Sequence, residues 1–130
     1  MKLYWGKKVS FLVILTGIVM IIVSCNDEFE DYDNTLPAIR IRILNGCGFK
    51  GAAAEMRNHL SQYNVDIVGI GNADRFVYDK TIIVVKQDDH QDLERLMRYT
   101  DIDRRVYALS DDSVESFQII VGRDYLTYLQ

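Results

Sequence analysis

The chain has 130 residues and a formal net charge of −4. This length suffices for one small domain with a tether and is too short for a dinucleotide-binding fold built from two halves. Three of the 15 basic residues precede residue 25 and all 19 acidic residues follow it, so the later part lacks the basic footprint that nucleic-acid binding requires.

Residues 1–24 have the pattern of a signal peptide. A cationic start, MKLYWGKK, precedes an apolar run from Val9 to Val23, which is shorter than the roughly 20 residues of a membrane-spanning helix. Cys25 follows Ile-Val-Ser, which resembles the bacterial lipobox, where the cysteine becomes the acylated first residue of a lipoprotein. The alternative is an uncleaved membrane anchor. Both predict a membrane-anchored, extracytoplasmic domain, periplasmic or on the cell surface.

Residues 25–37 are expected to form an acidic linker. The run NDEFEDYDNTL holds five acids and no base and ends before Pro37, the only proline, which is typical of an extended, self-repelling spacer. Cys47 is the second of two cysteines, so an acylated Cys25 leaves it without a disulfide partner. Neither thiol has histidines at zinc-ligand spacing, and we expect no metal and no cofactor.

The folded part begins with a strand, a glycine-rich turn and a helix. AIRIRIL, residues 38–44, alternates isoleucine with arginine, which predicts a strand with one buried face. Residues 52–63 carry apolar side chains at helical spacing, and Asn64 is expected to end that helix as a left-handed cap.

Between these elements Gly46, Gly48 and Gly51 spell G-x-G-x-x-G, the pattern of a dinucleotide loop. The acid that binds the ribose should follow about 20 residues later, at the end of the second strand, but Ile-Gly-Asn stands there. A tight turn explains the glycines better, because Asn45-Gly46 is a turn pair and Gly48 can adopt a positive φ. The alternative left open is a nucleotide- or phosphate-binding enzyme that holds an anion at the helix start.

The remaining patterns predict four strands and a second helix. Strands are expected at residues 65–70, 81–86, 105–109 and 116–121, and a helix at 87–100 with Asp88 or Asp89 as its N-cap. The order β-α-β-β-α-β-β favours an α+β two-layer sandwich, ferredoxin-like with an extra strand, with both helices on one sheet face.

Two groups of polar residues follow predicted strands. Asn72 and Asp74 stand in the loop GNAD, and Arg123, Asp124 and Tyr125 follow the last strand. Their simplest role is to form Asx turns and to bind loop N–H groups; ligand recognition is the alternative. No Ser/His/Asp or Cys/His set has a supporting motif, so we expect no catalytic residue and no enzyme.

Three ordered blocks, IRIRILNGCGFKGAAAEM, VDIVGIGNADRFVYDKTIIVV and IIVGRDY, resemble the LytR C-terminal domain of LytR/CpsA/Psr envelope proteins. The resemblance spans residues 38–125 and leaves residues 126–130 as a tail. In that family a separate, larger domain carries the glycopolymer transfer, so the resemblance implies a stand-alone accessory module without the enzyme.

These observations predict a non-catalytic cell-envelope module, tethered to the membrane by a lipid or an N-terminal helix. Its expected role is binding or scaffolding in cell-wall assembly, with peptidoglycan, a wall polymer or an envelope protein as partner and no nucleic acid. The alternative without a ligand is a purely structural lipoprotein.

Overall fold

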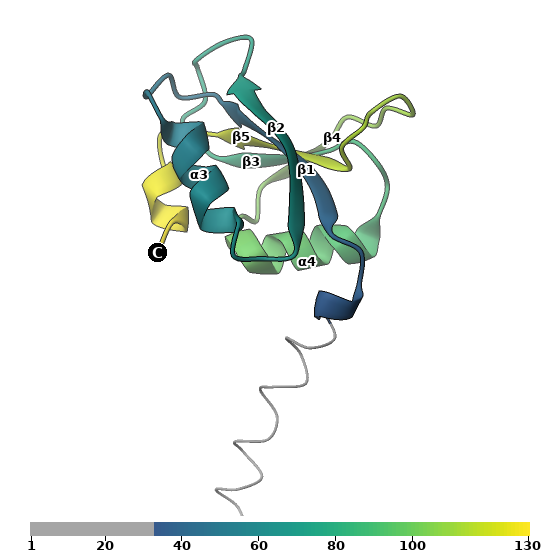
Figure 1. The fold of residues 1–130 in the computed structure, drawn as a ribbon. Helices are drawn as coiled ribbons and strands as arrows, with labels where there is room; N and C mark the ends of the chain where they lie inside the picture. Colours follow the sequence, from purple (N-terminus) through teal and green to yellow (C-terminus); the bar gives the residue numbers. More distant parts are fainter. Residues whose placement is uncertain (1–32) are drawn as a thin grey trace, which may run out of the picture. The chain divides into compact units, whose positions relative to one another are not determined.

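The computed structural model describes residues 33–130, of which Ala38–Gln130 form one compact unit (Figure 1). The predicted signal peptide, Cys25 and most of the predicted linker lie outside the described residues. In chain order the elements are β1 (Ile39–Asn45), α3 (Ala52–Leu60), β2 (Val65–Asn72), β3 (Ile82–Val85), α4 (His90–Thr100), β4 (Arg105–Tyr107), β5 (Phe117–Val121) and the 3-10 helix η1 (Tyr125–Tyr128). None of the helices within residues 33–130 is long and apolar enough to cross a membrane.

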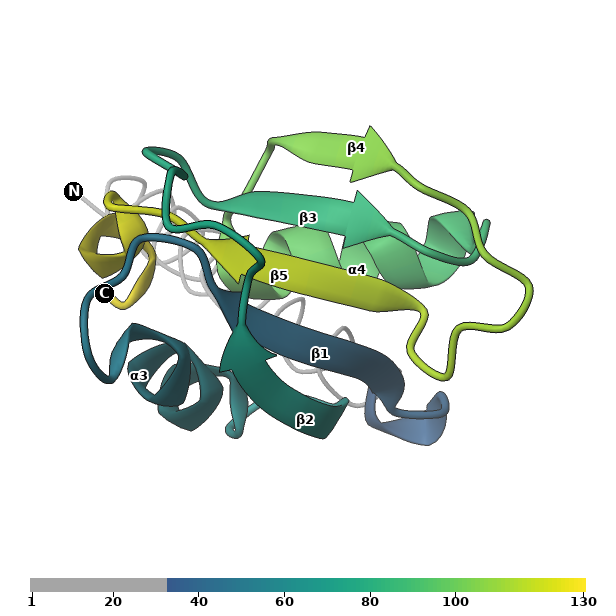
Figure 2. The ribbon, with the colours of Figure 1, turned by 90° about the horizontal axis from the view of Figure 1, so that it is seen from above.

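The five strands form one sheet in the order β2-β1-β5-β3-β4 (Figure 2). β1 is parallel to both β2 and β5, β3 is antiparallel to β5, and β4 is parallel to β3. The carboxyl ends of β1, β2 and β5 therefore lie at the same end of the sheet. The glycine-rich turn and the GNAD loop begin at this end.

The expected α+β two-layer sandwich is confirmed, and both helices cover one face of the sheet (Figures 1 and 2). The alternation in β1 is also confirmed, because Ile39, Ile41 and Ile43 are fully buried. They share a core with Met56 and Leu60 of α3, with two leucines of α4, and with apolar residues of β3 and β5. Among residues 33–130, neither α3 nor α4 lies on the opposite face of the sheet.

The strand order differs from the ferredoxin-like plan, which is a split β-α-β arrangement. Here β1 and β2, which α3 connects, are direct neighbours, and so are β3 and β4, which α4 connects. Strand pairing is a tertiary choice, and the order of elements along the chain is compatible with both plans.

The prediction that Asn64 adopts a left-handed cap is wrong. α3 ends at Leu60, and its cap residue Ser61 has a right-handed helical conformation, with its hydroxyl donating to the carbonyl of Asn58. Within residues 33–130 the one non-glycine residue with positive φ is Asp101, which ends α4. At the chain end, Tyr128 and Leu129 pack against the core.

Candidate functional site

The side chain of Asn45 organises the glycine-rich turn. Asn45 is 7% exposed; its Oδ1 accepts hydrogen bonds from the backbone N–H groups of Cys47 (3.2 Å) and Gly48 (3.0 Å). Its Nδ2 donates to the carbonyl oxygen of Phe49 at 2.7 Å. Two of the loop N–H groups that a phosphate could use, those of Cys47 and Gly48, are therefore already bound inside the loop.

Two of the glycines are required for different physical reasons. A Cβ at Gly46 would lie 2.6 Å from the Ile120 Cγ2 and 2.8 Å from the Tyr78 ring, so this position is one of close packing. Gly48 has a φ of +79°, a conformation that side chains other than glycine rarely adopt. The pattern that resembles a cofactor loop thus has a purely structural explanation at these positions.

The start of α3 already carries negative charge. Glu55 lies in the first turn, after the N-cap residue Gly51, which has a φ of +87°. Burial, followed by the nearby Glu55 carboxylate, raises the pKa of the Tyr125 hydroxyl. A carboxylate at the positive end of the helix dipole competes with any bound anion. The alternative of a phosphate-binding enzyme therefore gains no support from this helix start.

Asp124 ties the end of β5 to the start of β3. Its Oδ1 accepts hydrogen bonds from the Thr81 backbone N–H (2.7 Å) and hydroxyl (2.8 Å), and Thr81 is fully buried. The Thr81 hydroxyl oxygen in turn accepts from the Gly122 N–H at 3.0 Å. Lys80 and Arg104 each place a cation 3.8 Å from the other carboxylate oxygen. This arrangement is a structural joint.

Arg123 and Tyr125 have interaction partners that differ from those of Asp124. Arg123 pairs with the exposed Asp79 at 3.2 Å, and Tyr125 is buried, 7% exposed, in the core. Arg123, Asp124 and Tyr125 thus each interact with different neighbours. They do not converge on one ligand-binding point.

Asn72 and Asp74 line a cavity of about 370 Å³ on the sheet face opposite α3 and α4. Leu44 and Ile120, paired across β1 and β5, lie on its sheet side. The remaining lining residues come from the loop after β2 and from β5: Ala73, Arg75, Val77, Tyr78 and Gln118. The cavity therefore combines an apolar floor with amide, carboxylate and guanidinium groups.

A polar cluster supports the Gln118 side of this cavity. The Gln118 amide donates to the Glu115 carboxylate at 2.6 Å, and Arg42 approaches the same oxygen at 3.3 Å. Burial raises the pKa of Glu115, but the hydrogen bond from Gln118, one with its own backbone and the charge of Arg42 outweigh burial, so that the pKa is lowered. Glu115 therefore stays ionised and holds Gln118 in place.

Arg42, Glu115 and Gln118 were not predicted as site residues from the sequence. The alternation in β1 and in residues 116–121 was the available signal, because it puts Arg42 and Gln118 on the same face of the sheet. Their neighbourhood depends on β1 pairing with β5, which the sequence alone does not reveal.

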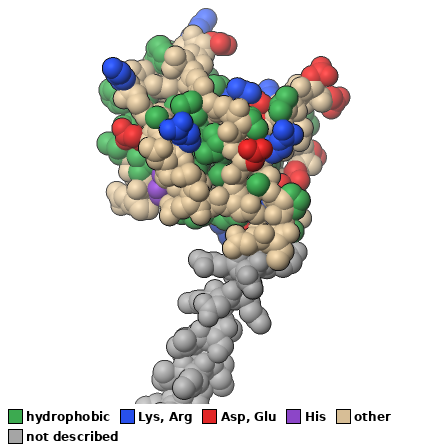
Figure 3. Space-filling view, viewed as in Figure 1, with side chains coloured by type: hydrophobic (Ala, Val, Ile, Leu, Met, Phe, Trp, Pro, Cys, Tyr) green, Lys and Arg blue, Asp and Glu red, His purple; other side chains and the backbone are tan. Residues whose placement is uncertain are grey.

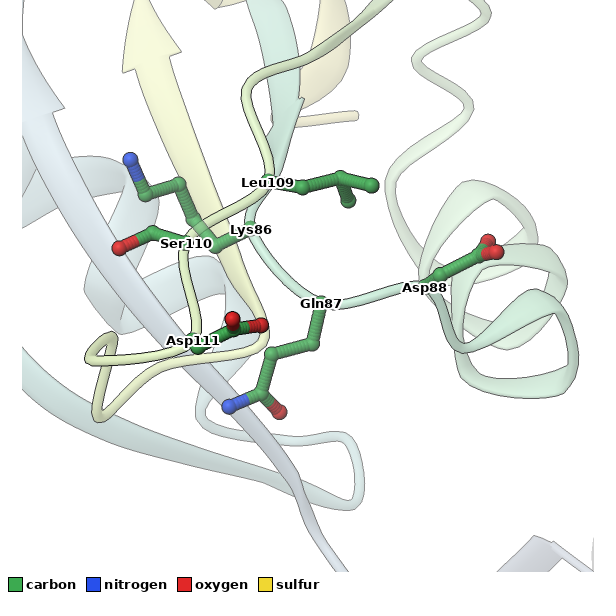
Figure 4. Close-up of a pocket in the computed structure, with 6 residues that line it drawn as sticks. All are labelled: Lys86, Gln87, Asp88, Leu109, Ser110 and Asp111. Atoms are coloured by element: carbon green, nitrogen blue, oxygen red, sulfur yellow. The ribbon is translucent and has the colours of Figure 1, made fainter.

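A second cavity, of about 330 Å³, lies where β3 and β4 end. In Figure 4 Lys86 and Ser110 extend to one side of the two chain segments, while Leu109 and Asp88 extend to the other. Gln87 is already bound, since it donates to the Ser113 carbonyl and accepts from the Ser116 hydroxyl, both at 3.0 Å. None of the polar residues that were predicted to follow strands, namely Asn72, Asp74, Arg123, Asp124 and Tyr125, lines this cavity.

Neither the charges on the face seen in Figure 3 nor metal-ligand chemistry within residues 33–130 indicates a further site. On the face seen in Figure 3, basic and acidic side chains are interspersed. Within residues 33–130 no group of three His, Cys, Asp or Glu side chains could hold a metal ion. The one cysteine in this range, Cys47, is a buried free thiol.

The fold and the polar groups define a small α+β module whose polar side chains hold loops, with a cavity on the sheet face opposite α3 and α4. The chain belongs to the LytR C-terminal domain family: the family model LytR_C, described as "LytR cell envelope-related transcriptional attenuator", matches residues 38–125. It is therefore a cell-envelope-associated accessory domain. No curated protein and no solved structure matches the chain.

Proposed function

We propose that the chain is a non-catalytic module of the cell envelope, tethered to the membrane, that binds a wall glycan in the cavity beside the GNAD loop. The glycan is peptidoglycan or a polymer attached to it. The observation that carries this proposal is the cavity of about 370 Å³ lined by Asn72 and Asp74, which come from the second sequence block of the family.

The lining chemistry supports a sugar ligand. A sugar ring has apolar C–H faces and a rim of hydroxyl groups. Leu44, Ile120 and Tyr78 supply apolar surface for the C–H faces of the ring. The amide, carboxylate and guanidinium groups of the lining can form hydrogen bonds with the sugar hydroxyls. Ligand sites of α/β sheets also favour the carboxyl ends of parallel strands, and the volume falls in the usual range of roughly 300–1,000 Å³ for small-ligand pockets.

A binding assay with purified peptidoglycan sacculi tests this proposal, using residues 38–130, which contain the whole core. We expect the wild-type unit to be retained, and Asp74→Ala with Arg75→Ala to weaken retention about tenfold, the effect of losing roughly 1.4 kcal/mol of binding energy. Both side chains are exposed, so the fold should not change.

The matched control is Glu94→Ala with Arg57→Ala, which removes the same charges from exposed positions on α4 and α3. This variant should bind sacculi as the wild type does. If the wild-type unit is not retained by sacculi with or without attached polymer, the glycan proposal is wrong and a protein partner takes its place.

The tether in this proposal rests on the lipobox-like residues before Cys25. Mass spectrometry of the full chain purified from membranes should show a mature protein that begins at Cys25 and carries a diacylglyceryl group. An unmodified full-length mass would instead support an uncleaved N-terminal anchor.

A further inference from the structure

β4 is an edge strand that is exposed along its whole length. It lies at the end of the sheet order, beside β3 alone, and residues 103–109 are all exposed. Three large apolar side chains in this run are about half exposed: Val106 (46%), Tyr107 (53%) and Leu109 (59%). An exposed apolar edge is a template for pairing with another strand.

The backbone hydrogen bonds show which groups of β4 face the open side. Ile83 N donates to the carbonyl of Arg104, and Ala108 N donates to the carbonyl of Val85, both at 2.9 Å. In a parallel pair the residues of a strand alternate between facing the partner and facing away. The N–H and C=O groups of Arg105 and Tyr107 therefore point away from β3, into the space beyond the edge.

The opposite edge of the sheet is built differently. β2 pairs with β1 through a register shift between Ile41 and Arg42, and such bulges twist an edge and impede further pairing. The pairing of β3 with β4 runs without a shift through its three residue pairs. Of the two edge strands, β4 is therefore better suited than β2 to pair with an additional strand.

We propose that β4 pairs with β4 of a second copy of the chain, antiparallel about a two-fold axis at Tyr107. In this register Arg105 lies opposite Leu109 of the other copy and diagonal to its Asp111. Two cations, Arg104 and Arg105, stand at the start of each strand, and two acids, Asp111 and Asp112, follow its end, so antiparallel pairing brings opposite charges together. Asp103 would face Asp111, which limits the pairing to residues 104–110.

The apolar side chains favour the same arrangement. Tyr107 of each copy would lie beside Tyr107 of the other on the side of the sheet that carries the helices, with the two Leu109 side chains flanking them. The interface is small, so the association is weak for the free unit. Anchoring two copies to one membrane would raise their effective concentration and favour the pair. This inference is independent of the glycan proposal and uses a different surface.

Sedimentation equilibrium of residues 38–130 over a wide concentration range tests the proposal. The expected result is an average mass that rises toward twice that of one copy as concentration increases. Tyr107→Pro removes an outward N–H, which an edge strand tolerates, and should keep the unit monomeric. Tyr107→Ala keeps the N–H and should retain part of the association, which separates backbone pairing from the loss of the ring.

Exchanging the charges of Arg105 and Asp111 tests the register of the proposed strand pair. Arg105→Asp should weaken the association and Arg105→Asp with Asp111→Arg should restore it, while circular dichroism confirms that every variant is folded. A wild-type unit that stays monomeric at all concentrations overturns the proposal. A dimer that Tyr107→Pro leaves unchanged overturns the assignment to β4.

Discussion

Buried and partly buried polar side chains hold the loops of this molecule. Asn45 binds the backbone of the turn that follows it, and Asp124 binds Thr81, 43 residues away in sequence. The local bonds of Asn45 follow from the Asn-Gly pair, so the sequence predicts them. The partner of Asp124 could not be predicted, because it depends on how β5 lies beside β3.

Removing the Asp124 carboxylate should destabilise the fold. Asp124→Ala leaves the buried Thr81 N–H and hydroxyl without their acceptor, which we expect to cost about 3 kcal/mol of unfolding free energy, measured by urea denaturation. Asp124→Asn keeps one oxygen and should cost less. Asp79→Ala, which breaks only the exposed ion pair with Arg123, should change the unfolding free energy by no more than about 0.5 kcal/mol. An equal loss of stability in Asp124→Ala and Asp79→Ala would contradict the stabilising role of the bonds between Asp124 and Thr81.

Glu115 should make stability depend on pH in the acid range. Its pKa is lowered in the folded state, so the unfolded state binds more protons at low pH. The stabilisation is complete above the ordinary value of 4.5 and is lost as the pH falls through the lowered pKa. Glu115→Gln should flatten this part of the pH profile of unfolding free energy. A profile identical to that of the wild type would show that Glu115 does not contribute.

At the level of elements, side-chain periodicity predicted all five strands and both helices of the unit. The boundaries were less accurate: α3 is shorter than predicted, β2 continues to Asn72, and β4 ends at Tyr107. These ends are set by bonds to neighbouring elements. For example, the Ala73 N–H donates to the Asn45 carbonyl at 2.9 Å and extends the pairing of β1 with β2.

The cap of α4 distinguishes two adjacent acids. The sequence predicted Asp88 or Asp89, and the structure selects Asp89, whose carboxylate accepts from the Asp92 N–H at 2.9 Å. Asp89→Ala should lower the unfolding free energy by about 1 kcal/mol, the usual value for a lost N-cap. Asp88→Ala is the matched control and should leave thermal and urea unfolding nearly unchanged. A larger loss for Asp88→Ala would reverse the assignment.

At the scale of the whole molecule, the last residues belong to the packed unit. The sequence suggested a tail at residues 126–130, whereas η1 brings Tyr128 and Leu129 against the core. Contacts of this kind join chain segments that no local pattern connects.

Deleting residues 126–130 should therefore destabilise the unit. The loss of two partly buried apolar side chains is expected to cost about 2 to 4 kcal/mol, following the burial energy of large apolar residues. The measurement is urea unfolding of residues 38–125 against residues 38–130. Equal midpoints would show that these residues act as a tail after all.

The family, the α+β class and the buried face of each amphipathic element could be predicted from the sequence, because side-chain periodicity and turn residues act over short distances along the chain. The strand order, the bonds between Asp124 and Thr81, the cavity beside the GNAD loop and the exposed edge at β4 could be found only in the folded molecule. Each of these depends on strands far apart in sequence lying side by side. Such pairing is selected by the packing of the whole core, which no single segment encodes.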